Sequence, residues 1–230
     1  MPTDTLTLIS VLSLSTGALC AAWIVHDVIR HPAKMAIMNF VWPISALFGS
    51  VLLLWFYLKH GRETSGDTRH DPPFSIAVAK GALHCGAGCT LGDIIAETLA
   101  LALPGVLLLF GYPHLFEERI FAVWGLDYVF ALGIGIVFQY FAIAPMRDLG
   151  LREGLWVAFK ADVLSLSAWQ VGMYGAMAIA HFVIFPSLDT KLDAASPSFW
   201  FAMQLAMLAG FATAYPVNWW LIRSGVKERM

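Results

Sequence analysis

Charged residues are scarce in this chain of 230 residues. Asp, Glu, Lys and Arg together make up 13% of it, against 59% hydrophobic residues, whereas soluble domains carry about 25% charged residues. The formal net charge is only −2, and no arginine-rich or aromatic-interleaved basic run occurs, which excludes nucleic acid as a partner. The composition therefore predicts an all-α integral membrane protein whose main partner is the lipid bilayer.

Three further absences narrow the function classes. No Lys or Arg precedes Arg30, so the N-terminus lacks the basic region of a secretory signal peptide. The chain has three cysteines, all in apolar segments, which give no disulfide framework. It also lacks a phosphate-binding loop and a nucleophile elbow, so ATP-driven and hydrolytic chemistry have no support. We expect a transporter or metal-binding protein rather than an enzyme.

Long apolar runs are abundant by contrast. Windows of about twenty residues, the length that crosses a hydrocarbon core, occur six times. They lie near residues 6–28, 35–57, 82–103, 120–146, 163–185 and 199–222. The polar stretch 61–73 predicts a loop between two three-helix halves. We expect one transmembrane domain, residues 1–230, with about six helices.

The distribution of cations predicts the orientation of these helices. Six crossings place both termini on one side of the membrane. That side then holds ten of the Lys and Arg residues and the other side holds four. By the positive-inside rule, we expect both termini and the loop 61–73 in the cytoplasm, with the protein in a bacterial inner membrane.

The third apolar window carries the most informative pattern. Cys85, Cys89, Asp93 and Glu97 follow one another at steps of four, so on an α-helix they drift by about 40° per step and share one side. An uncompensated carboxylate at membrane depth costs about 2.5 to 3.5 kcal/mol on insertion scales, and such groups normally face a protein interior or an ion path. This side of the helix is the predicted functional site.

The residue types at this site favour a soft metal ion. Thiolates from Cys85 and Cys89 suit Cu(I) or Zn(II), and His84 can add an imidazole. Asp93 and Glu97 would relay a cation or protons deeper in the membrane. The sequence thus predicts a metal site formed by these five residues.

Other windows hold side chains that can support the site. Asp127 lies at a depth similar to that of Glu97, so the two can share a proton or cation, or Asp127 can bond a neighbouring Tyr or Trp. Methionines at helical spacing favour Cu(I), although they also serve as core filler. Asn218 follows a proline and is expected to bond backbone carbonyls. The full set of supporting candidates is Asp127, Asp162, Ser165, Gln170, Met173, Met177, His181, Met203, Met207 and Asn218.

Three motifs carry a resemblance to a known family. They are His-Cys-x-x-Gly-Cys-x-x-Gly-Asp-x-x-x-Glu at 84–97, Ala-Asp-x-x-Ser-Leu at 161–166 followed by Gly-Met at 172–173, and Pro-x-Asn-Trp-Trp at 216–220. Over residues 75–230 the chain resembles the bacterial membrane family catalogued as domain of unknown function 4396. The resemblance implies a multi-pass bacterial membrane protein in which the motif at 84–97 is important. This chain has Gln170 where related chains would have an acid, which argues against a charge from the fifth window.

The leading hypothesis is a membrane protein that binds and transports a soft transition-metal ion, with Cu(I) favoured over Zn(II). It would act alone, as a homo-oligomer or with other membrane subunits. One alternative is a membrane thiol-disulfide oxidoreductase using Cys85 and Cys89, although helical cysteines four residues apart have Cα atoms about 6 Å apart and parallel side chains. Another is a non-catalytic accessory subunit whose glycine-rich face, including Gly88, packs against a partner.

Overall fold

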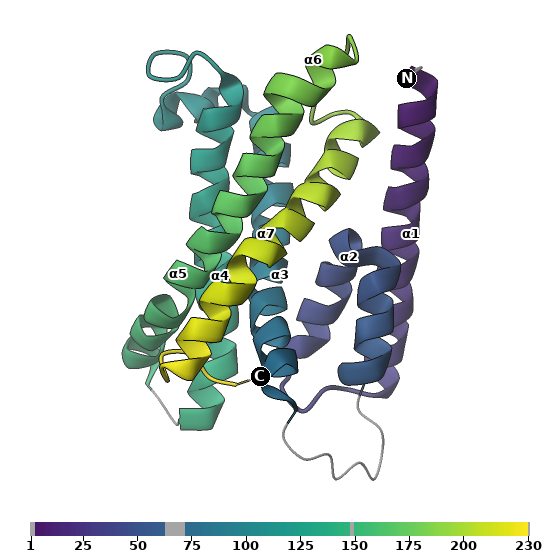
Figure 1. Cartoon of the computed structure of the whole chain (residues 1–230). Helices are drawn as coiled ribbons and strands as arrows, with labels where there is room; N and C mark the ends of the chain where they lie inside the picture. The colour runs from purple at the N-terminus through teal and green to yellow at the C-terminus, as the bar shows by residue number, and fades with distance from the viewer. Residues whose placement is uncertain (1–2, 63–71, 148–149, 230) are drawn as a thin grey trace.

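The computed structural model describes residues 3–62, 72–147 and 150–229, and within these ranges every regular element is a helix (Figure 1). In chain order the elements are α1 (Thr3–Arg30), α2 (Met38–His60), α3 (Phe74–Ala102), the 3₁₀-helix η1 (Pro104–Phe110), α4 (Arg119–Arg147), α5 (Leu151–Ile179), the π-helix η2 (Ala180–Ile184), α6 (Phe185–Ser187) and α7 (Pro197–Arg223). Six helices are long and apolar enough to cross a membrane. The predicted all-α membrane bundle is confirmed, and most of the predicted loop 61–73 lies outside the described residues.

The outer surface of the bundle is apolar. Leu19, Leu52 and Val171 are each about 70% exposed, an arrangement that a water-soluble monomer avoids and lipid tails accommodate. Near one end of the bundle, Lys59 lies over the ring of Trp55 and Lys160 over that of Trp156. Tryptophan paired with cations is typical of the membrane–water interface. The chain is a multi-pass membrane protein.

The element α2 does not run straight through the bundle. Ser50, at its middle, has φ 45° and ψ −128°, which interrupts the helix. The rings of Trp42 and Tyr57 lie 5.5 Å apart, although the same residues on a continuous helix would be about 22 Å apart. Figure 1 shows the two halves side by side. Each half is about 15 to 18 Å long, too short for a hydrocarbon core of about 30 Å, so α2 is a re-entrant hairpin.

Contacts at its tip satisfy the backbone that this reversal frees. The carbonyl of Leu47 accepts a 2.6 Å hydrogen bond from the side-chain amide of Gln204 on α7. The other end of that amide accepts a bond from the hydroxyl of Ser13 on α1. Gly17 lets α1 approach, since a Cβ there would come within 2.7 Å of the Leu47 carbonyl. Non-helical backbone at membrane depth is tolerated when protein covers it in this way.

The reversal of α2 changes the topology. Because the hairpin returns to the end at which it began, the two termini lie at opposite ends of the bundle (Figure 1). The prediction that both termini share one side is therefore wrong. The same turn moves Arg30 and Lys34 to the end that holds Lys227, so among the described Lys and Arg residues only Arg119 and Lys191 lie at the opposite end.

The helix α3 is the most buried of the six long helices. Its glycine-rich face lies against α4, because a Cβ at Gly92 would come within 2.7 Å of the Cα of Ala131, and one at Gly88 within 3.3 Å of the Cα of Gly135. The face expected to bind a separate subunit is thus covered by a helix of the same chain. This close approach fixes how the polar side chains of α3 meet those of α4 and α5.

Candidate functional site

The four polar side chains spaced along α3 all point into the bundle. Cys85 and Cys89 are fully buried, Asp93 is 2% exposed and Glu97 is 5% exposed. Their neighbours come from α4, α5 and α7, so the stripe forms a polar column through the middle of the protein. The column divides into two groups of contacts.

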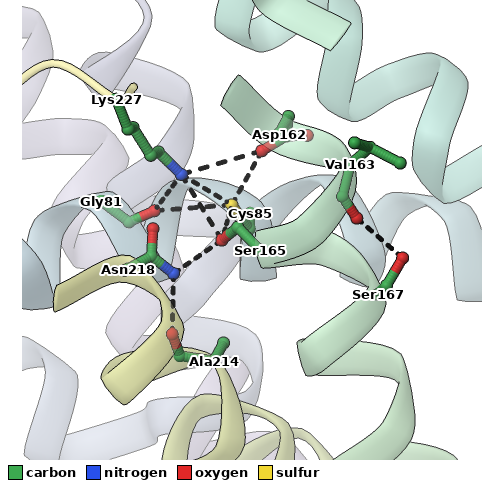
Figure 2. A network of polar contacts seen from close by, with 9 residues as sticks. All are labelled: Gly81, Cys85, Asp162, Val163, Ser165, Ser167, Ala214, Asn218 and Lys227. Carbon is green, nitrogen blue, oxygen red and sulfur yellow. Dashed lines mark hydrogen bonds and ion pairs between the residues drawn. The ribbon is translucent and has the colours of Figure 1, made fainter. Parts of the chain in front are cut away.

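The first group, which we call the thiol cluster, consists of Cys85, Asp162, Ser165, Asn218 and Lys227 (Figure 2). The sulfur of Cys85 lies 2.8 Å from Oδ1 of Asp162, to which the thiol donates, and 2.9 Å from the hydroxyl of Ser165. Both partners lie on α5, one turn apart on the same side of the helix. The spacing of the Ala-Asp-x-x-Ser motif thus places both side chains against the same thiol.

The cation of the thiol cluster comes from the C-terminal tail. After α7, Gly225 has φ 75° and turns the chain back, and the backbone N–H groups of Val226 and Lys227 both donate to the carbonyl of Leu221. The ammonium of Lys227 then donates to the sulfur of Cys85 at 3.0 Å and to the carbonyl of Gly81 at 3.2 Å. Sequence reasoning treated Lys227 only as a surface cation. The glycine after α7, a common helix-ending signal, was the available hint.

The charge of Lys227 is paired at full burial. Its Nζ lies 3.8 Å from Oδ1 of Asp162, and neither side chain has exposed surface. A Lys or Asp is almost never found so deep without such a partner. The other oxygen of Asp162 faces the Cα of Gly135 on α4, where any side chain would collide with it.

The predicted role of Asn218 is present and extended. Its side-chain NH₂ donates to the carbonyl of Ala214, one turn back, and to the hydroxyl of Ser165 at 2.6 Å. The second bond ties α7 to α5. The amide oxygen of Asn218 is buried next to Gly81, and no described group donates a hydrogen bond to it.

The second group, the acid cluster, consists of Asp93, Glu97, Asp127, Gln170 and Tyr174. The carboxyl groups of Asp93 and Asp127 lie close enough to interact with each other. Asp127 also accepts a 2.8 Å bond from the hydroxyl of Tyr174 and a 3.4 Å bond from the amide of Gln170. Neither oxygen of Asp93 has a donor from a neutral or basic group of the described protein. Asp127 thus interacts with Asp93 and with Glu97, and the bond to a tyrosine is present.

Two cavities reach the acid cluster. A cavity of about 280 Å³ at the η1 end is lined by charged groups that include Glu97, Glu118, Arg119 and Lys191; we call it the charged cavity. A second, of about 210 Å³, lies at the tip of the α2 hairpin and includes Asp93; we call it the tip cavity. The charged cavity has the polar lining that holds water, whereas the tip cavity is lined mainly by apolar side chains. Glu97 borders the first cavity, and Asp93, one turn away on α3, borders the second.

The remaining predicted ligands do not join one coordination sphere. His84 is fully buried with its ring 5.9 Å from that of Phe138, and neither ring nitrogen has a hydrogen-bond partner among the described residues. Cys89 lies between the two clusters on α3. Within the described ranges, no three His, Cys, Asp or Glu side chains converge on one point suited to a metal. The five predicted ligands form a column instead of a single site.

The supporting methionines belong to the hydrophobic core. Met173, Met177, Met203 and Met207 are buried among apolar side chains, and the sulfur of Met207 accepts a hydrogen bond from the indole of Trp169. His181 lies at the mouth of the charged cavity, 3.4 Å from Glu118. None of these contacts reaches Cys85.

A family model described as a domain of unknown function, DUF4396, matches residues 76–227. This range covers well over half of the chain and includes every residue of both clusters. A search of curated proteins and a search of solved structures found no match. The resemblance seen in the three motifs is thereby confirmed, and the chain belongs to the family described as domain of unknown function 4396.

Proposed function

We propose that the protein is a transporter that moves a cation along the inward side of α3, and that Asp93 and Asp127 carry a proton during this movement. The proposal rests on one observation: Asp93 is buried at membrane depth against a second carboxyl group, and its oxygens have no donor from a neutral or basic group of the described protein. Two ionised carboxylates repel strongly in such a place, so the pair holds together by sharing a proton. Acids at this depth mark ion and proton paths.

The cavities support a path for the cation. The charged cavity opens at the η1 end and reaches Glu97. Asp93 follows one turn deeper and borders the tip cavity. From there Cys89 and then the thiol cluster continue along the same side of α3. Every step along this side is about 6 Å, the rise of four helical residues.

The re-entrant hairpin supports the same function. In many transporters the ion site lies where interrupted helices meet near the middle of the membrane. Here the tip of α2 lies beside the cavity that Asp93 lines. Such a hairpin places non-helical backbone at membrane depth, next to the acid cluster.

Several predictions about cargo and setting accompany this proposal. The preference for Cu(I), followed by Zn(II), rests on Cys85 and Cys89 and stays a prediction. So do the bacterial inner membrane and the partner subunits or homo-oligomer. With α2 as a hairpin, the positive-inside rule places the Lys227 end in the cytoplasm and the N-terminus outside. Oxidoreductase chemistry also stays a prediction, but the contacts of Cys85 with Asp162 and Lys227 favour ion binding.

Reconstitution into liposomes tests the proposal. Purified protein is placed in vesicles that contain a pH-sensitive dye, and Zn(II) or Cu(I) is added outside under reducing conditions. We expect metal-dependent proton movement that falls by about tenfold or more in Asp93→Asn and in Asp127→Asn. Glu118→Gln is the matched control, because that acid is 54% exposed at the mouth of the charged cavity.

Two results would overturn the proposal. One is transport by Asp93→Asn at the rate of the unaltered protein. The other is a rate in vesicles with unaltered protein no higher than in vesicles without protein, for both metals and for an imposed proton gradient.

A further inference from the structure

The surroundings of the Lys227 ammonium resemble a cation site more than an ordinary ion pair. Four acceptors lie around Nζ: the sulfur of Cys85 at 3.0 Å, the carbonyl of Gly81 at 3.2 Å, the hydroxyl of Ser165 at 3.5 Å and Oδ1 of Asp162 at 3.8 Å. They come from α3 and α5, two helices of the bundle. A lysine held only by charge would need one carboxylate, not a ring of neutral acceptors.

A fifth atom able to bind a cation lies near the Lys227 ammonium. The amide oxygen of Asn218 is fully buried, has no hydrogen-bond donor in the part of the chain that the structure describes, and lies beside Gly81. Figure 2 shows this oxygen on the side of Asn218 that faces Gly81 and Lys227. A buried oxygen without a donor is costly, and a cation at this point would satisfy it.

We propose that Lys227 is a tethered cation that occupies a metal site, and that a divalent ion of borderline softness, with Zn(II) as the reference, replaces it when the C-terminal tail withdraws. This inference rests on the proposed cation transport. One thiolate and one carboxylate are ligands that Zn(II) uses, and the neutral oxygens complete the set, whereas Cu(I) selects sites richer in sulfur. The contacts thus shift the expected cargo from Cu(I) to Zn(II).

The charges balance in both states. With the tail in place, the ammonium of Lys227 neutralises the carboxylate of Asp162 beside a neutral thiol. With a divalent ion in place, Asp162 and the thiolate of Cys85 together neutralise two positive charges, and the thiol proton is released on binding. No net charge is left at this buried point in either state. Metal–ligand distances of about 2.0 to 2.3 Å require the sulfur of Cys85 to move by about 0.7 Å and the carboxylate of Asp162 by about 1.8 Å.

The tail can leave without unwinding a long helix. Lys227 lies beyond the end of α7 at Arg223, and the turn at Gly225 is held by bonds to the carbonyls of Leu221 and Ile222. Further along, the guanidinium of Arg229 lies over the ring of Phe74, where α3 begins. The tail therefore covers one end of the polar column and can move away from it while α7 stays helical.

Metal binding by purified full-length protein tests the site. Co(II) serves as the probe, because a thiolate ligand gives it a charge-transfer absorption that oxygen ligands do not. Lys227→Met removes the ammonium and keeps an apolar stem. We expect it to bind one Co(II) with this absorption, about tenfold or more tightly than the unaltered protein. Lys160→Met, which removes a surface lysine at the same end, should bind like the unaltered protein. Adding Cys85→Ser to Lys227→Met should abolish the absorption.

A second measurement covers the case in which Lys227→Met does not fold. Unaltered protein is treated with an amine-reactive ester with and without Zn(II), and labelled lysines are identified by mass spectrometry. Lys227 is 2% exposed, so it should react only when the tail withdraws. We expect Zn(II) to raise its labelling about fivefold or more while the labelling of Lys160 stays constant.

The inference fails if Lys227→Met binds Co(II) no more tightly than the unaltered protein, if the absorption survives Cys85→Ser, or if Zn(II) leaves the labelling of Lys227 unchanged. None of these readouts requires transport. A failure of Asp93→Asn to impair transport would therefore remove the proposed function without touching the metal site, and the two failures are distinguishable.

Discussion

The thiol cluster and the acid cluster lie on the same side of α3, two turns apart, and hold their charged groups in opposite ways. In the thiol cluster, Asp162 has a buried cation, and Cys85 contacts three polar side chains. In the acid cluster, Asp93 meets another acid and borders a cavity. The acid of the thiol cluster is therefore paired with a cation, whereas the acid cluster borders a cavity and holds more than one acid.

This difference separates stability from transport. A buried ion pair with good geometry is strongly destabilised when one partner is removed, because the other charge is left alone. Two buried acids next to each other repel when both are ionised, so their contact lowers the stability of the fold. Changes in the thiol cluster should therefore weaken the fold, and changes in the acid cluster should spare it.

The largest effect is expected from separating the buried ion pair. Lys227→Met leaves Asp162 buried and unpaired, which should lower the free energy of unfolding by about 3 to 5 kcal/mol. The double variant Lys227→Met with Asp162→Asn should recover most of this loss. Thermal or denaturant unfolding in detergent measures both, with Lys160→Met as the control. A double variant as unstable as the sum of the two single changes would show that the pair is not coupled.

Forcing α3 away from α4 should disturb both clusters at once. At Gly92 any added side chain meets the backbone of Ala131, so Gly92→Leu should cost about 1 to 3 kcal/mol of stability and also reduce transport. Gly133→Leu is the matched control, because nothing lies within 4 Å of a Cβ at that position. Equal stability of the two variants would mean that the close approach of the helices is not required.

Replacing Asp93 should show most clearly that the acid cluster serves transport and the thiol cluster stability. Asp93→Asn keeps the shape of the side chain and removes a buried charge or proton. We expect its unfolding free energy to stay within about 1 kcal/mol of the unaltered protein or to rise, while transport is lost. A large loss of stability would instead show that Asp93 stabilises the fold, as the residues of the thiol cluster do.

The smallest effect is expected at the edge of the acid cluster. Tyr174→Phe removes a 2.8 Å hydrogen bond to Asp127, and the loss should be about 1 kcal/mol together with slower proton movement. Tyr128→Phe removes a bond of the same length to Ser167, away from the acids. It should cost similar stability and leave transport unchanged. Slower proton movement in both variants would remove the special role of Tyr174.

Local patterns predicted much of this molecule. The apolar windows marked the six long helices, and the four-residue steps from Cys85 to Glu97 placed those side chains on the inward side of α3. Helical periodicity is a short-range property, so it is visible in sequence. The helices themselves extend further than the apolar windows, as at Phe74 in α3 and Leu151 in α5, because these first turns mix apolar residues with charged ones such as Lys80 and Arg152.

Long-range features escaped the same reasoning. The reversal at Ser50 lies in a continuous apolar run, and its stability comes from contacts with Gln204 and Gly17, far away in sequence. The burial of Lys227 depends on a tail that folds back onto α3 and α5. Depth in the bundle is a tertiary property, and hydropathy assigned this lysine to the surface.

Infrared spectroscopy of the purified protein detects directly the proton that Asp93 and Asp127 are proposed to share. We expect a carbonyl band from a protonated, buried carboxyl group that disappears in Asp93→Asn, persists in Glu118→Gln and changes when the transported cation is added. If no protonated carboxyl band depends on Asp93 or Asp127, the two acids do not share a proton.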